Sequence, residues 1–377
     1  MPVWQRARML AAIMRSGRSL AIAGAHGKTT TTSMVGYLFK QAGLDPTVLV
    51  GGELNDFGGN AHVGMGKIVV AEADESDGSF LLMNPDCAIV TNVEADHLDH
   101  WGTYELLRQG YADFLGGLAP DGLAIVCFDS PGAREAAQMA GRKTISYGLQ
   151  AEDAQWRAED IELGAEGSRF TVIREGRELG QARLTVPGRH NVSNSLAAFA
   201  AAAEQGIAFE QASQIMPGYR GALRRWQTVG SAAGVTVIDD YAHHPTEIAA
   251  TLSAARSCRQ GQGRVVCVFQ PHRYSRTFLL GEEFGKAFAD ADLLIVTDIY
   301  AAGEKPIEGV SGRIIYDSAA RQCSAETHYI PNPNDAKAFL AGKLEPGDLA
   351  LTMGAGDIWR IGKPLLDDLA LRSQAAV

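Results

Sequence analysis

The segment from Ala21 to Val35, "AIAGAHGKTTTTSMV", carries the residue types of a phosphate-binding loop. A glycine loop between a strand and a helix presents backbone N–H groups and a helix N-terminus to an anion. The common loop has four residues between its first glycine and Gly-Lys-Thr, whereas two separate Gly24 from Gly27. Lys28 adds a charge for terminal phosphates, and the Thr29 hydroxyl can ligate Mg²⁺. The sequence therefore predicts a shortened phosphate loop, against the alternative of a tight glycine turn with a solvated lysine.

Acidic and imidazole side chains follow two apolar runs that we expect to be strands. Glu72 ends the run in "VVAEADES", and His97 follows the run in "TNVEADHLDH". Because ligands of parallel α/β sheets bind beyond the C-terminal ends of the strands, this pair beside the loop can bind a divalent metal. The alternative for His97 is a histidine satisfied within the core. Three further acidic residues are interpreted as cap residues or a solvated acidic face: Asp74, Glu75 and Asp77.

These residues require a sheet and helices to position them. After the loop, "TTTTSMVGYLFKQAG" places Met34, Val35, Leu38 and Phe39 on one helical face. Further strands are expected in "KIVVAEADES", "DCAIVTNVEADH", "GLAIVCF" and "KTISYG", with helices such as "YELLRQGYADFLGGL" between some of them. Alternating strands and helices predict a parallel sheet with both faces covered. The run "SRFTVIREGRELGQARLTV" predicts a β-hairpin.

A domain boundary is expected in "MPGYRGALRR", which contains Pro217, Gly218 and Gly221. A second alternation follows, with strands in "GVTVIDD", "GRVVCVFQ", "ADLLIVTD" and "GDLALTMGAGD". The prediction is an α/β protein of two domains. Residues 1–220 form a P-loop-type central ATP-binding domain with a parallel sheet, and residues 221–377 form a Rossmann-like, doubly wound C-terminal domain.

The composition limits the classes of partner. The net charge is −10, which argues against a general nucleic-acid-binding surface, because such a surface needs clustered Lys and Arg. No apolar run approaches the length that spans a membrane. The five cysteines are scattered without a CxxC pair, which is typical of a reduced, cytoplasmic protein. We therefore expect neither a nucleic-acid nor a membrane partner, while an anionic substrate remains compatible with local bases and metals.

Seven motifs occur in one order along nearly the whole chain: "GAHGKTTTT", "AEADESDGSF", "NVEADHLDHWG", "GRHNVSNSLAA", "DDYAHHPTEI", "FQPHRYSRT" and "DIYAAGEKPIEG". In these motifs the chain resembles the Mur ligase family, most closely its alanine-adding branch. The resemblance implies an ATP-dependent, ADP-forming ligase of peptidoglycan biosynthesis. It would join L-alanine to the carboxylate of UDP-N-acetylmuramate through an acyl phosphate. Two alternatives remain open: another Mur-fold amide ligase, tripeptide-recycling or polyglutamate-adding, or an ATP-binding fragment inactive as a ligase.

The resemblance also implies the cofactors ATP and Mg²⁺ and the residues that hold them. The ATP loop would comprise Gly24, Ala25, His26, Gly27, Lys28, Thr29 and Thr30. The metal ligands would be Thr29, Glu72 and His97. Further nucleotide contacts would come from Asn191, Asn194, Arg225 and Asp240, with Asp239 as a neighbour. Lys28, His97, Arg225 and Asp240 would act in catalysis. The substrates would meet His97, Tyr241, His243, His272, Arg273 and Arg276.

Some of these residues also have a purely structural interpretation. Asn191 could be a plain helix cap, and Arg273 and Arg276 could be ordinary surface charges.

The chain departs from the family pattern in two places. Many Mur ligases hold the second metal with a carbamylated lysine, and the stretch between Lys67 and Lys143, around Arg108 and Gln109, has no lysine. The alanine-adding branch shares this absence. The family also has an N-terminal UDP-binding domain ahead of the ATP loop. We expect that domain to be missing from this chain or to be a separate partner.

Overall fold

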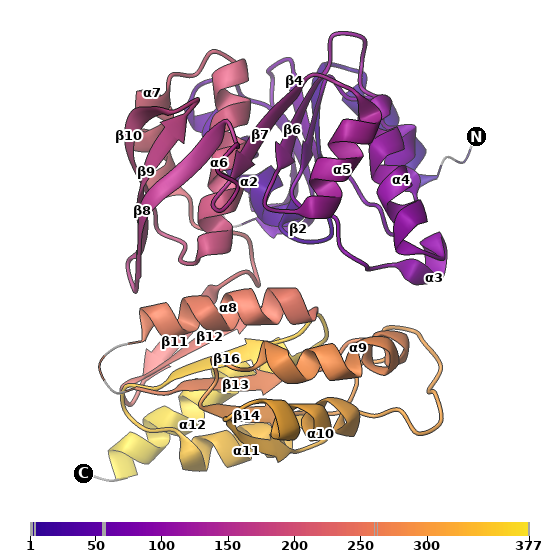
Figure 1. Cartoon of the computed structure of the whole chain (residues 1–377). Coiled ribbons are helices and arrows are strands. Elements are labelled where there is room, and N and C mark those ends of the chain that lie inside the picture. Colours follow the sequence, from indigo (N-terminus) through magenta and orange to yellow (C-terminus); the bar gives the residue numbers. More distant parts are fainter. Residues whose placement is uncertain (1–2, 4, 55–57, 260, 262, 376–377) are drawn as a thin grey trace. The chain divides into compact units, whose positions relative to one another are not determined.

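The computed structural model describes residues 3, 5–54, 58–259, 261 and 263–375 (Figure 1). Its contacts divide the chain into two compact units. Unit 1 comprises the chain up to Glu162 together with Ser168–Leu223. Unit 2 comprises Leu163–Gly167 together with the chain from Arg224 onward. The domain division expected between residues 220 and 221 stays a prediction, and each unit is described by itself.

Unit 1 is built on a ten-stranded sheet in the order β10-β9-β8-β7-β6-β5-β1-β4-β2-β3. Its strands are β1 (Arg18–Ala23), β2 (Thr47–Leu54), β3 (Gly59–His62), β4 (Ile68–Glu72), β5 (Cys87–Val90), β6 (Leu123–Cys127), β7 (Thr144–Gly148), β8 (Trp156–Gly164), β9 (Gly167–Arg174) and β10 (Arg177–Leu184). The strands from β2 to β8 in this order pair in parallel, as predicted. The expected hairpin is confirmed as the antiparallel pair β9–β10.

The helices of unit 1 are α1 (Arg6–Met14), α2 (Lys28–Gln41), η1 (Ser79–Leu82), α3 (Leu98–Trp101), α4 (Tyr104–Gly116), α5 (Pro131–Ala140), α6 (Arg189–Glu204), α7 (Phe209–Ile215) and η2 (Met216–Gly218). Figure 1 shows α4 and α5 on one face of the sheet and α2 and α6 on the other. Strand β1 serves both faces, because Leu20 and Ile22 pack with α2 and α6 while Ala21 and Ala23 pack with α4. This alternation explains why β1 is a continuous apolar run.

Unit 2 is built on a six-stranded sheet in the order β11-β12-β16-β13-β14-β15. Its strands are β11 (Gln227–Ala232), β12 (Val235–Asp240), β13 (Val265–Phe269), β14 (Leu293–Val296), β15 (Glu326–Tyr329) and β16 (Leu349–Met353). Its helices are α8 (Pro245–Cys258), α9 (Tyr274–Ala287), α10 (Arg313–Gln322), α11 (Pro333–Lys343), η3 (Ile358–Ile361) and α12 (Gly362–Ala375). All pairs are parallel except the edge pair β11–β12.

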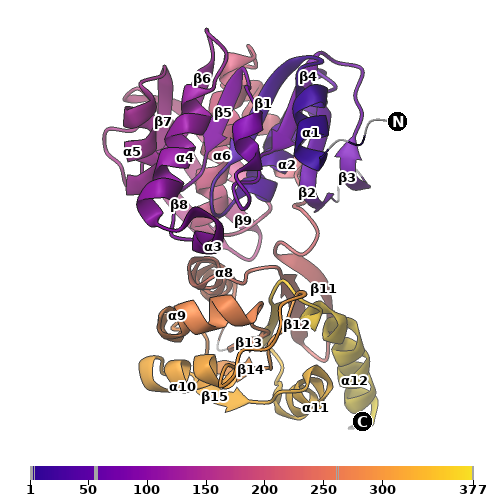
Figure 2. The same cartoon turned by 90° about the vertical axis from the view of Figure 1, so that its right-hand side faces the viewer.

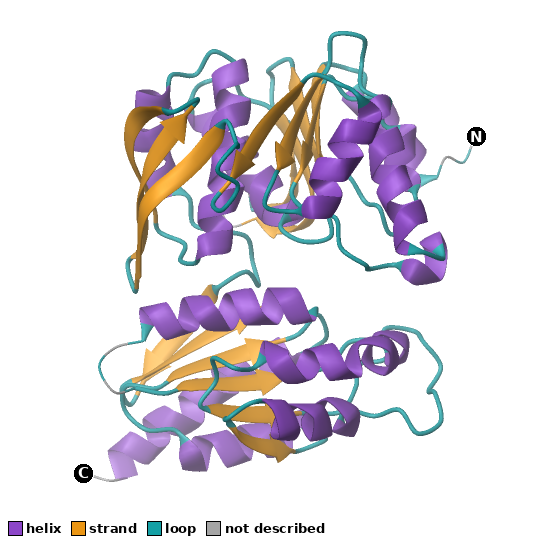
Figure 3. Ribbon diagram, in the orientation of Figure 1, coloured by secondary structure: helices purple, strands orange, loops and turns teal. Residues whose placement is uncertain are grey.

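Both faces of the unit 2 sheet are covered by helices, as Figures 2 and 3 show. Val265, Cys267 and Phe269 of β13 pack with α8, α9 and α10, whereas Val266 and Val268 pack with α11 and α12. The predicted α/β class with a doubly wound second unit is confirmed. None of the helices in the described part of the chain has both the length and the apolar composition needed to cross a membrane.

The register of each sheet brings strand ends together. In unit 1, Ile22 of β1 pairs with Glu72 of β4, and Ala23 pairs with Val90 of β5. The phosphate loop, the end of β4 and the segment after β5 therefore share one edge of the sheet, where parallel α/β sheets bind ligands.

Candidate functional site

The loop between β1 and α2 depends on its two glycines. Gly24 has φ 140° and Gly27 has φ 81°, values that side chains rarely adopt. A Cβ at Gly24 would collide with the Thr91 hydroxyl, and one at Gly27 would lie 2.9 Å from Oδ1 of Asn194. The shortened loop therefore packs directly against β5 and α6, and its main chain faces the sheet edge.

The N-terminus of α2 is open to an anion. Gly27 is its N-cap residue, and no side chain caps the helix. The first N–H groups of an α-helix lack partners within the helix, so those of Lys28, Thr29 and Thr30 are available to an acceptor. The positive end of the helix dipole lies at the same place. The arrangement fits the phosphate groups of a nucleotide.

Lys28 lies folded back over the loop. Its ammonium Nζ donates to Gly24 O at 2.5 Å, to Ala25 O at 3.3 Å and to Glu75 Oε1 at 2.7 Å. The interpretation of Glu75 as a cap residue or solvated acidic residue is wrong, because Glu75 is only 1% exposed. The segment after β4 turns this carboxylate inward to the lysine. Asp74 and Asp77 remain exposed and accept the N–H groups of Ser76 and Ser79.

Burial and charge oppose each other in the Lys28–Glu75 pair. Burial acts to lower the pKa of Lys28, but Glu75 and Glu72 outweigh it and the pKa is raised. Burial raises the pKa of Glu75, although the Lys28 ammonium acts to lower it. We take the pair as ionised, because an ammonium 2.7 Å away stabilises the anion directly.

Glu72 and Thr29 lie together at the end of β4. The Thr29 hydroxyl donates to Glu72 Oε2 at 3.0 Å, and the Gly51 N–H donates to the same oxygen at 2.8 Å. A hydroxyl beside a carboxylate is a set of hard oxygen donors, which suits Mg²⁺. These two predicted metal ligands are therefore brought together.

His97 lies on the other side of the Lys28–Glu75 pair. Its Nε2 is 4.0 Å from Glu75 Oε1 and 3.7 Å from Asp96 Oδ2. Its backbone is left-handed, with φ 55°, at the start of α3. His97 is thus a half-buried residue of the sheet edge and not a core histidine, and it faces Glu75, a residue that the sequence analysis did not select.

Residues at the end of β5 brace the loop and were also missed. Asn92 Oδ1 accepts the His26 N–H at 2.9 Å, and Asn92 Nδ2 and Thr91 Oγ1 both donate to His26 O. The His26 imidazole lies 3.3 Å from Glu94. The polar residues after "AIV" in "CAIVTNVE" were the available signal, because they follow a buried strand of the same sheet edge.

Helix α6 brings Asn191 and Asn194 to the loop side of unit 1. Both are buried, and Asn191 Nδ2 donates to Pro187 O at 2.7 Å. The N-cap residue of α6 is Gly188, so the alternative of Asn191 as the helix cap is not supported. Asn194 contacts the loop at Gly27. Their nucleotide contacts stay predictions.

In unit 2, Asp240 and Arg225 are held by different groups. Asp240 is buried and accepts the N–H groups of Trp226 and Ala242, each at 2.8 Å. Burial raises its pKa to about 6, against the lowering effect of Arg225. Arg225 NH1 lies 3.4 Å from Glu247 Oε1. Asp240 therefore fixes the chain around Trp226, while Arg225 is oriented by another carboxylate.

Arg224, which the sequence analysis did not select, holds the neighbouring aspartate. Its Nε donates to Asp239 Oδ2 at 3.1 Å, and its other nitrogens donate to the carbonyls of Gly354 and Gly356. Arg224 therefore links the end of β12 to the loop that follows β16.

Four rings form a continuous group, here called the ring cluster: Tyr241, His243, His272 and Tyr300. The ring centroids of His243 lie 5.3 Å from Tyr241 and 5.6 Å from His272, and His272 stacks on Tyr300 at 5.8 Å with an interplanar angle of 9°. Burial, His243 and the arginines at 276 and 273 lower the pKa of His272 to about 3. His272 is therefore neutral at physiological pH, and Tyr300 is a member that the motif spacing did not reveal.

The two predicted substrate arginines lie beside this cluster at the start of α9. Arg276 NH1 is 3.4 Å from His272 Nδ1. Arg273 has φ 73°, and its N–H donates to Tyr300 O at 2.9 Å. The Arg276 guanidinium contacts the ring cluster, which favours a positioned side chain over an ordinary surface charge. Arg273 is joined to the cluster through its main chain, and the substrate contacts of both arginines stay predictions.

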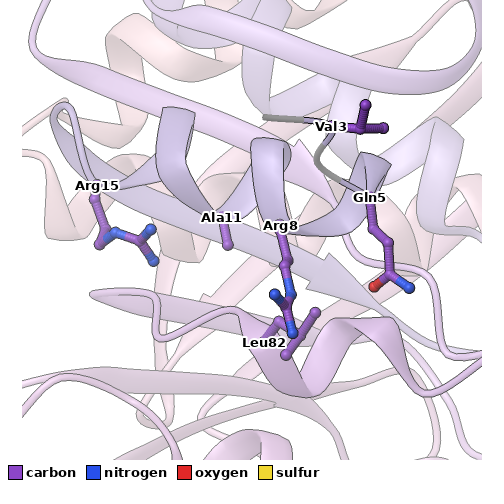
Figure 4. A pocket seen from close by; sticks show the side chains of 6 residues that line it. All are labelled: Val3, Gln5, Arg8, Ala11, Arg15 and Leu82. Atoms are coloured by element: carbon purple, nitrogen blue, oxygen red, sulfur yellow. The ribbon is translucent and has the colours of Figure 1, made fainter. Parts of the chain in front are cut away.

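A separate hollow of about 600 Å³ lies beside α1. Figure 4 shows Arg8 and Leu82 next to each other at its wall, with the other lining residues Val3, Gln5, Ala11 and Arg15. None of the predicted site residues lines it, so we do not assign the ligand chemistry to it.

Comparison with known proteins places this geometry in a family. Residues 22–202 match the Mur ligase middle domain, and residues 224–356 match the Mur ligase, glutamate ligase domain. The UDP-N-acetylmuramate–L-alanine ligase of Desulforamulus reducens is 45% identical over 98% of this chain and 79% of its own length. The enzyme of the same name from Pelotomaculum thermopropionicum is 47% identical over 98% of this chain and 80% of its own length.

Solved structures agree with these sequences. The UDP-N-acetylmuramate–alanine ligase MurC of Thermotoga maritima superimposes with a TM-score of 0.81 at 26% identity, over 98% of this chain and 78% of that one. MurF of Thermotoga maritima, solved in complex with ADP, shares the fold with a TM-score of 0.77 at 19% identity, over 99% of this chain and 86% of that one. These similarities establish that the chain belongs to the Mur ligase family, and the open loop, the half-buried Lys28 and the paired strand ends agree with that membership.

Proposed function

We propose that this chain is the ligase that joins L-alanine to the carboxylate of UDP-N-acetylmuramate with consumption of ATP, in peptidoglycan biosynthesis. The observation that carries the proposal is the identity of 45–47% to curated enzymes of that name, over 98% of the chain. The sites described above supply the groups that such a reaction needs.

Unit 1 is proposed to bind the nucleotide. The N–H groups at the start of α2 and the Lys28 ammonium receive its phosphates, and Asn194 lies against the same loop. Mg²⁺ is proposed to bind at Thr29 and Glu72, with His97 as a further ligand near the lysine. Bound there, Mg²⁺ would add positive charge to that of Lys28, and neutralising the charge of the phosphates is the main requirement of phosphoryl transfer.

The proposed reaction has two steps. A carboxylate oxygen of UDP-N-acetylmuramate attacks the terminal phosphorus of ATP, and ADP leaves. The amine of L-alanine then attacks the acyl carbon, phosphate leaves, and the nitrogen loses a proton. No covalent bond to the protein is needed, so the residues act by positioning and by neutralising charge.

Unit 2 is proposed to receive L-alanine. Arg273 and Arg276 can bind its carboxylate, since guanidinium groups match carboxylates in geometry. The neutral His272 offers a hydrogen-bonding group without adding a further charge. Arg225 and Asp240 are proposed to serve the nucleotide, with Asp240 acting through the chain that it fixes around Trp226.

The chain spans 79–80% of the length of the two curated relatives named above. We propose that the UDP group is held by a UDP-binding domain outside these residues, and that the enzyme works in the cytoplasm. The test is steady-state ligation with UDP-N-acetylmuramate varied. Weak or undetectable ligation, partly restored by a UDP-binding domain added in trans at high concentration, is expected. A KM like that of longer relatives would instead place the UDP site within residues 1–377.

Phosphate release in the presence of ATP, Mg²⁺, UDP-N-acetylmuramate and L-alanine tests the activity itself. Omission of each substrate in turn is the control. A pocket discriminates against a missing methyl(ene) group by about 1–3 kcal/mol, and an apolar pocket also rejects an added hydroxyl only about 10²-fold. Glycine and L-serine should therefore be poor substrates and not inert ones. Preference for a tripeptide over alanine would favour a recycling ligase. ATP binding without ligation, even with the UDP-binding domain supplied, would favour an inactive ATP-binding module.

A further inference from the structure

Among the described residues, the Glu75 carboxylate is hydrogen-bonded to one cation, the Lys28 ammonium, and the His97 imidazole lies 4.0 Å away. Glu75 is 1% exposed, and its Oε1 accepts from Lys28 at 2.7 Å. Its second oxygen, Oε2, is buried and has no hydrogen-bond partner among the described residues. Buried polar atoms are normally paired, and a buried carboxylate without a cation is strongly destabilising. Lys28 is therefore the group that makes this buried charge tolerable.

All three N–H donors of the Lys28 ammonium have an acceptor in this structure. An ammonium has three N–H donors, and they are directed to Gly24 O, Ala25 O and Glu75 Oε1. Two of these acceptors are neutral carbonyls, and the third is an anion. A phosphate oxygen can bind this ammonium only by displacing one of them or by sharing the cation with Glu75.

The backbone at Glu75 is held in place. The indole Nε1 of Trp101 donates to Glu75 O at 2.9 Å. The Trp101 ring packs edge-on against Phe80, with centroids 6.0 Å apart, and it fills the space that a side chain at Gly110 would need. Glu75 therefore stays buried beside the loop while a ligand approaches Lys28.

We propose that Glu75 is a positioning residue that holds the Lys28 ammonium folded over the loop and competes with nucleotide phosphates for it. Glu75 sets the affinity of the loop for phosphates: it keeps the lysine oriented over the loop without ligand, and it weakens ground-state binding. The inference rests on the proposed nucleotide site, and it goes beyond that site by assigning a role to a carboxylate that contacts no substrate.

The test compares the full chain with Glu75→Gln and, as a matched control, Asp77→Asn. The control removes a negative charge from the same segment, but Asp77 is exposed and accepts only from Ser79 among its described hydrogen bonds. Kd values for ATP and AMP are measured by calorimetry in EDTA, so that metal ligands do not contribute. Glu75→Gln should bind ATP on the order of tenfold more tightly, because the competing charge is gone. Its affinity for AMP, and both affinities of Asp77→Asn, should stay near those of the unsubstituted chain.

The outcomes separate this inference from the proposed function. Unchanged or weaker ATP binding by a folded Glu75→Gln variant would overturn the inference and leave the nucleotide site standing. Equal tightening for ATP and AMP would also overturn it, because AMP lacks the phosphates expected at Lys28. Absence of ATP binding by the unsubstituted chain would overturn both.

A stability cycle tests the coupling of Lys28 and Glu75 if the Glu75→Gln variant folds but is too unstable for calorimetry. Removal of one member of a buried ion pair leaves an unpaired charge or donor, whereas removal of both is often nearly neutral. The double variant Lys28→Met, Glu75→Gln should therefore melt at a higher temperature than either single variant. A double variant no more stable than the weaker single variant would show that the two residues are uncoupled and would overturn the inference.

Discussion

The phosphate loop of unit 1 and the ring cluster of unit 2 are built differently, although each follows the C-terminal ends of parallel strands. The loop presents main-chain N–H groups and one lysine between the carboxylates Glu72 and Glu75. The ring cluster presents side chains from three strand ends, beside the arginines at 273 and 276. The first site surrounds a cation with anions, and the second surrounds a neutral imidazole with cations.

This contrast predicts how each site responds to substitution. A main-chain site depends on very few side chains, so the loss of its one charged group should be severe. A site made of several contacting side chains should lose affinity in smaller steps, because its neighbours partly retain the geometry. The following experiments test that difference, in order of the expected effect.

The largest effect is expected for Lys28→Met. The ammonium is the only side-chain cation that the described hydrogen bonds place over the loop. Because Lys28 is proposed to stabilise the transition state, its loss should lower kcat by about 10²–10³-fold or more. The Tm of the Lys28→Met variant should also fall, because the buried Glu75 carboxylate loses the ammonium that it pairs with. The control is Lys40→Met on the same helix, for which steady-state ligation should remain near normal. This ligation assay and those for the variants below are run with the UDP-binding domain added in trans. Equal losses in both variants would contradict the loop assignment.

His97 should give the next largest effect. Because its φ is 55°, asparagine, which tolerates this conformation, is the better replacement than alanine. We expect His97→Asn to lower Mg²⁺-dependent turnover by about 10²-fold, by analogy with other lost active-site charge contacts. His100→Asn, on the neighbouring helix α3, is the matched control. A His97→Asn variant with a much lower Tm, but with the same Mg²⁺ dependence of turnover as the unsubstituted chain, would indicate that His97 has a structural role.

Arg276→Lys should have a smaller and more selective effect. Lysine keeps the charge but loses the planar pair of donors that matches a carboxylate. The KM for L-alanine should rise by about tenfold, at the low end of the energy of a charged hydrogen bond, while the KM for ATP stays unchanged. Arg313→Lys, an exposed arginine of α10 in the same unit, controls for charge. A rise in the KM for ATP alone would separate Arg276 from the amino-acid site.

The smallest effect concerns pH and His272. Its pKa is lowered from 6.5 to about 3, so the unfolded chain binds more protons between these values and stability falls as pH drops below 6.5. Asp240, with its pKa raised to about 6, contributes in the opposite direction, since its stabilising protonated form is lost as pH rises through 6.

Comparison with His272→Asn isolates the histidine. Since His272 is only half-buried, we expect its lowered pKa to reduce the free energy of unfolding by about 1 kcal/mol at pH 5, which corresponds to a Tm lower by about 2–4 °C. The unsubstituted chain should lose that much more Tm than the variant between pH 7 and pH 5. Parallel melting curves would show that His272 titrates normally.

Much of the fold and half of each site could be predicted from contiguous sequence. Glycine spacing followed by Lys28 and Thr29 defines a strand-loop-helix unit, because its members are neighbours in the chain. Glu72 could be placed at a strand end for the same reason, since a buried apolar run ends there. The α/β class followed from alternating strands and helices, whose periods are local properties.

The tertiary structure alone decided which polar residues turn inward. Nothing in "EADESD" distinguishes Glu75 from Asp74 or Asp77, because the path of that segment is set by Trp101, 26 residues farther along the chain. Likewise, Tyr300 joins His272 because β13 and β14 are adjacent in the sheet. Strand order and the packing of distant rings are long-range properties. Sequence spacing therefore determined what the loop could bind, and packing determined which side chains hold Lys28 and surround His272.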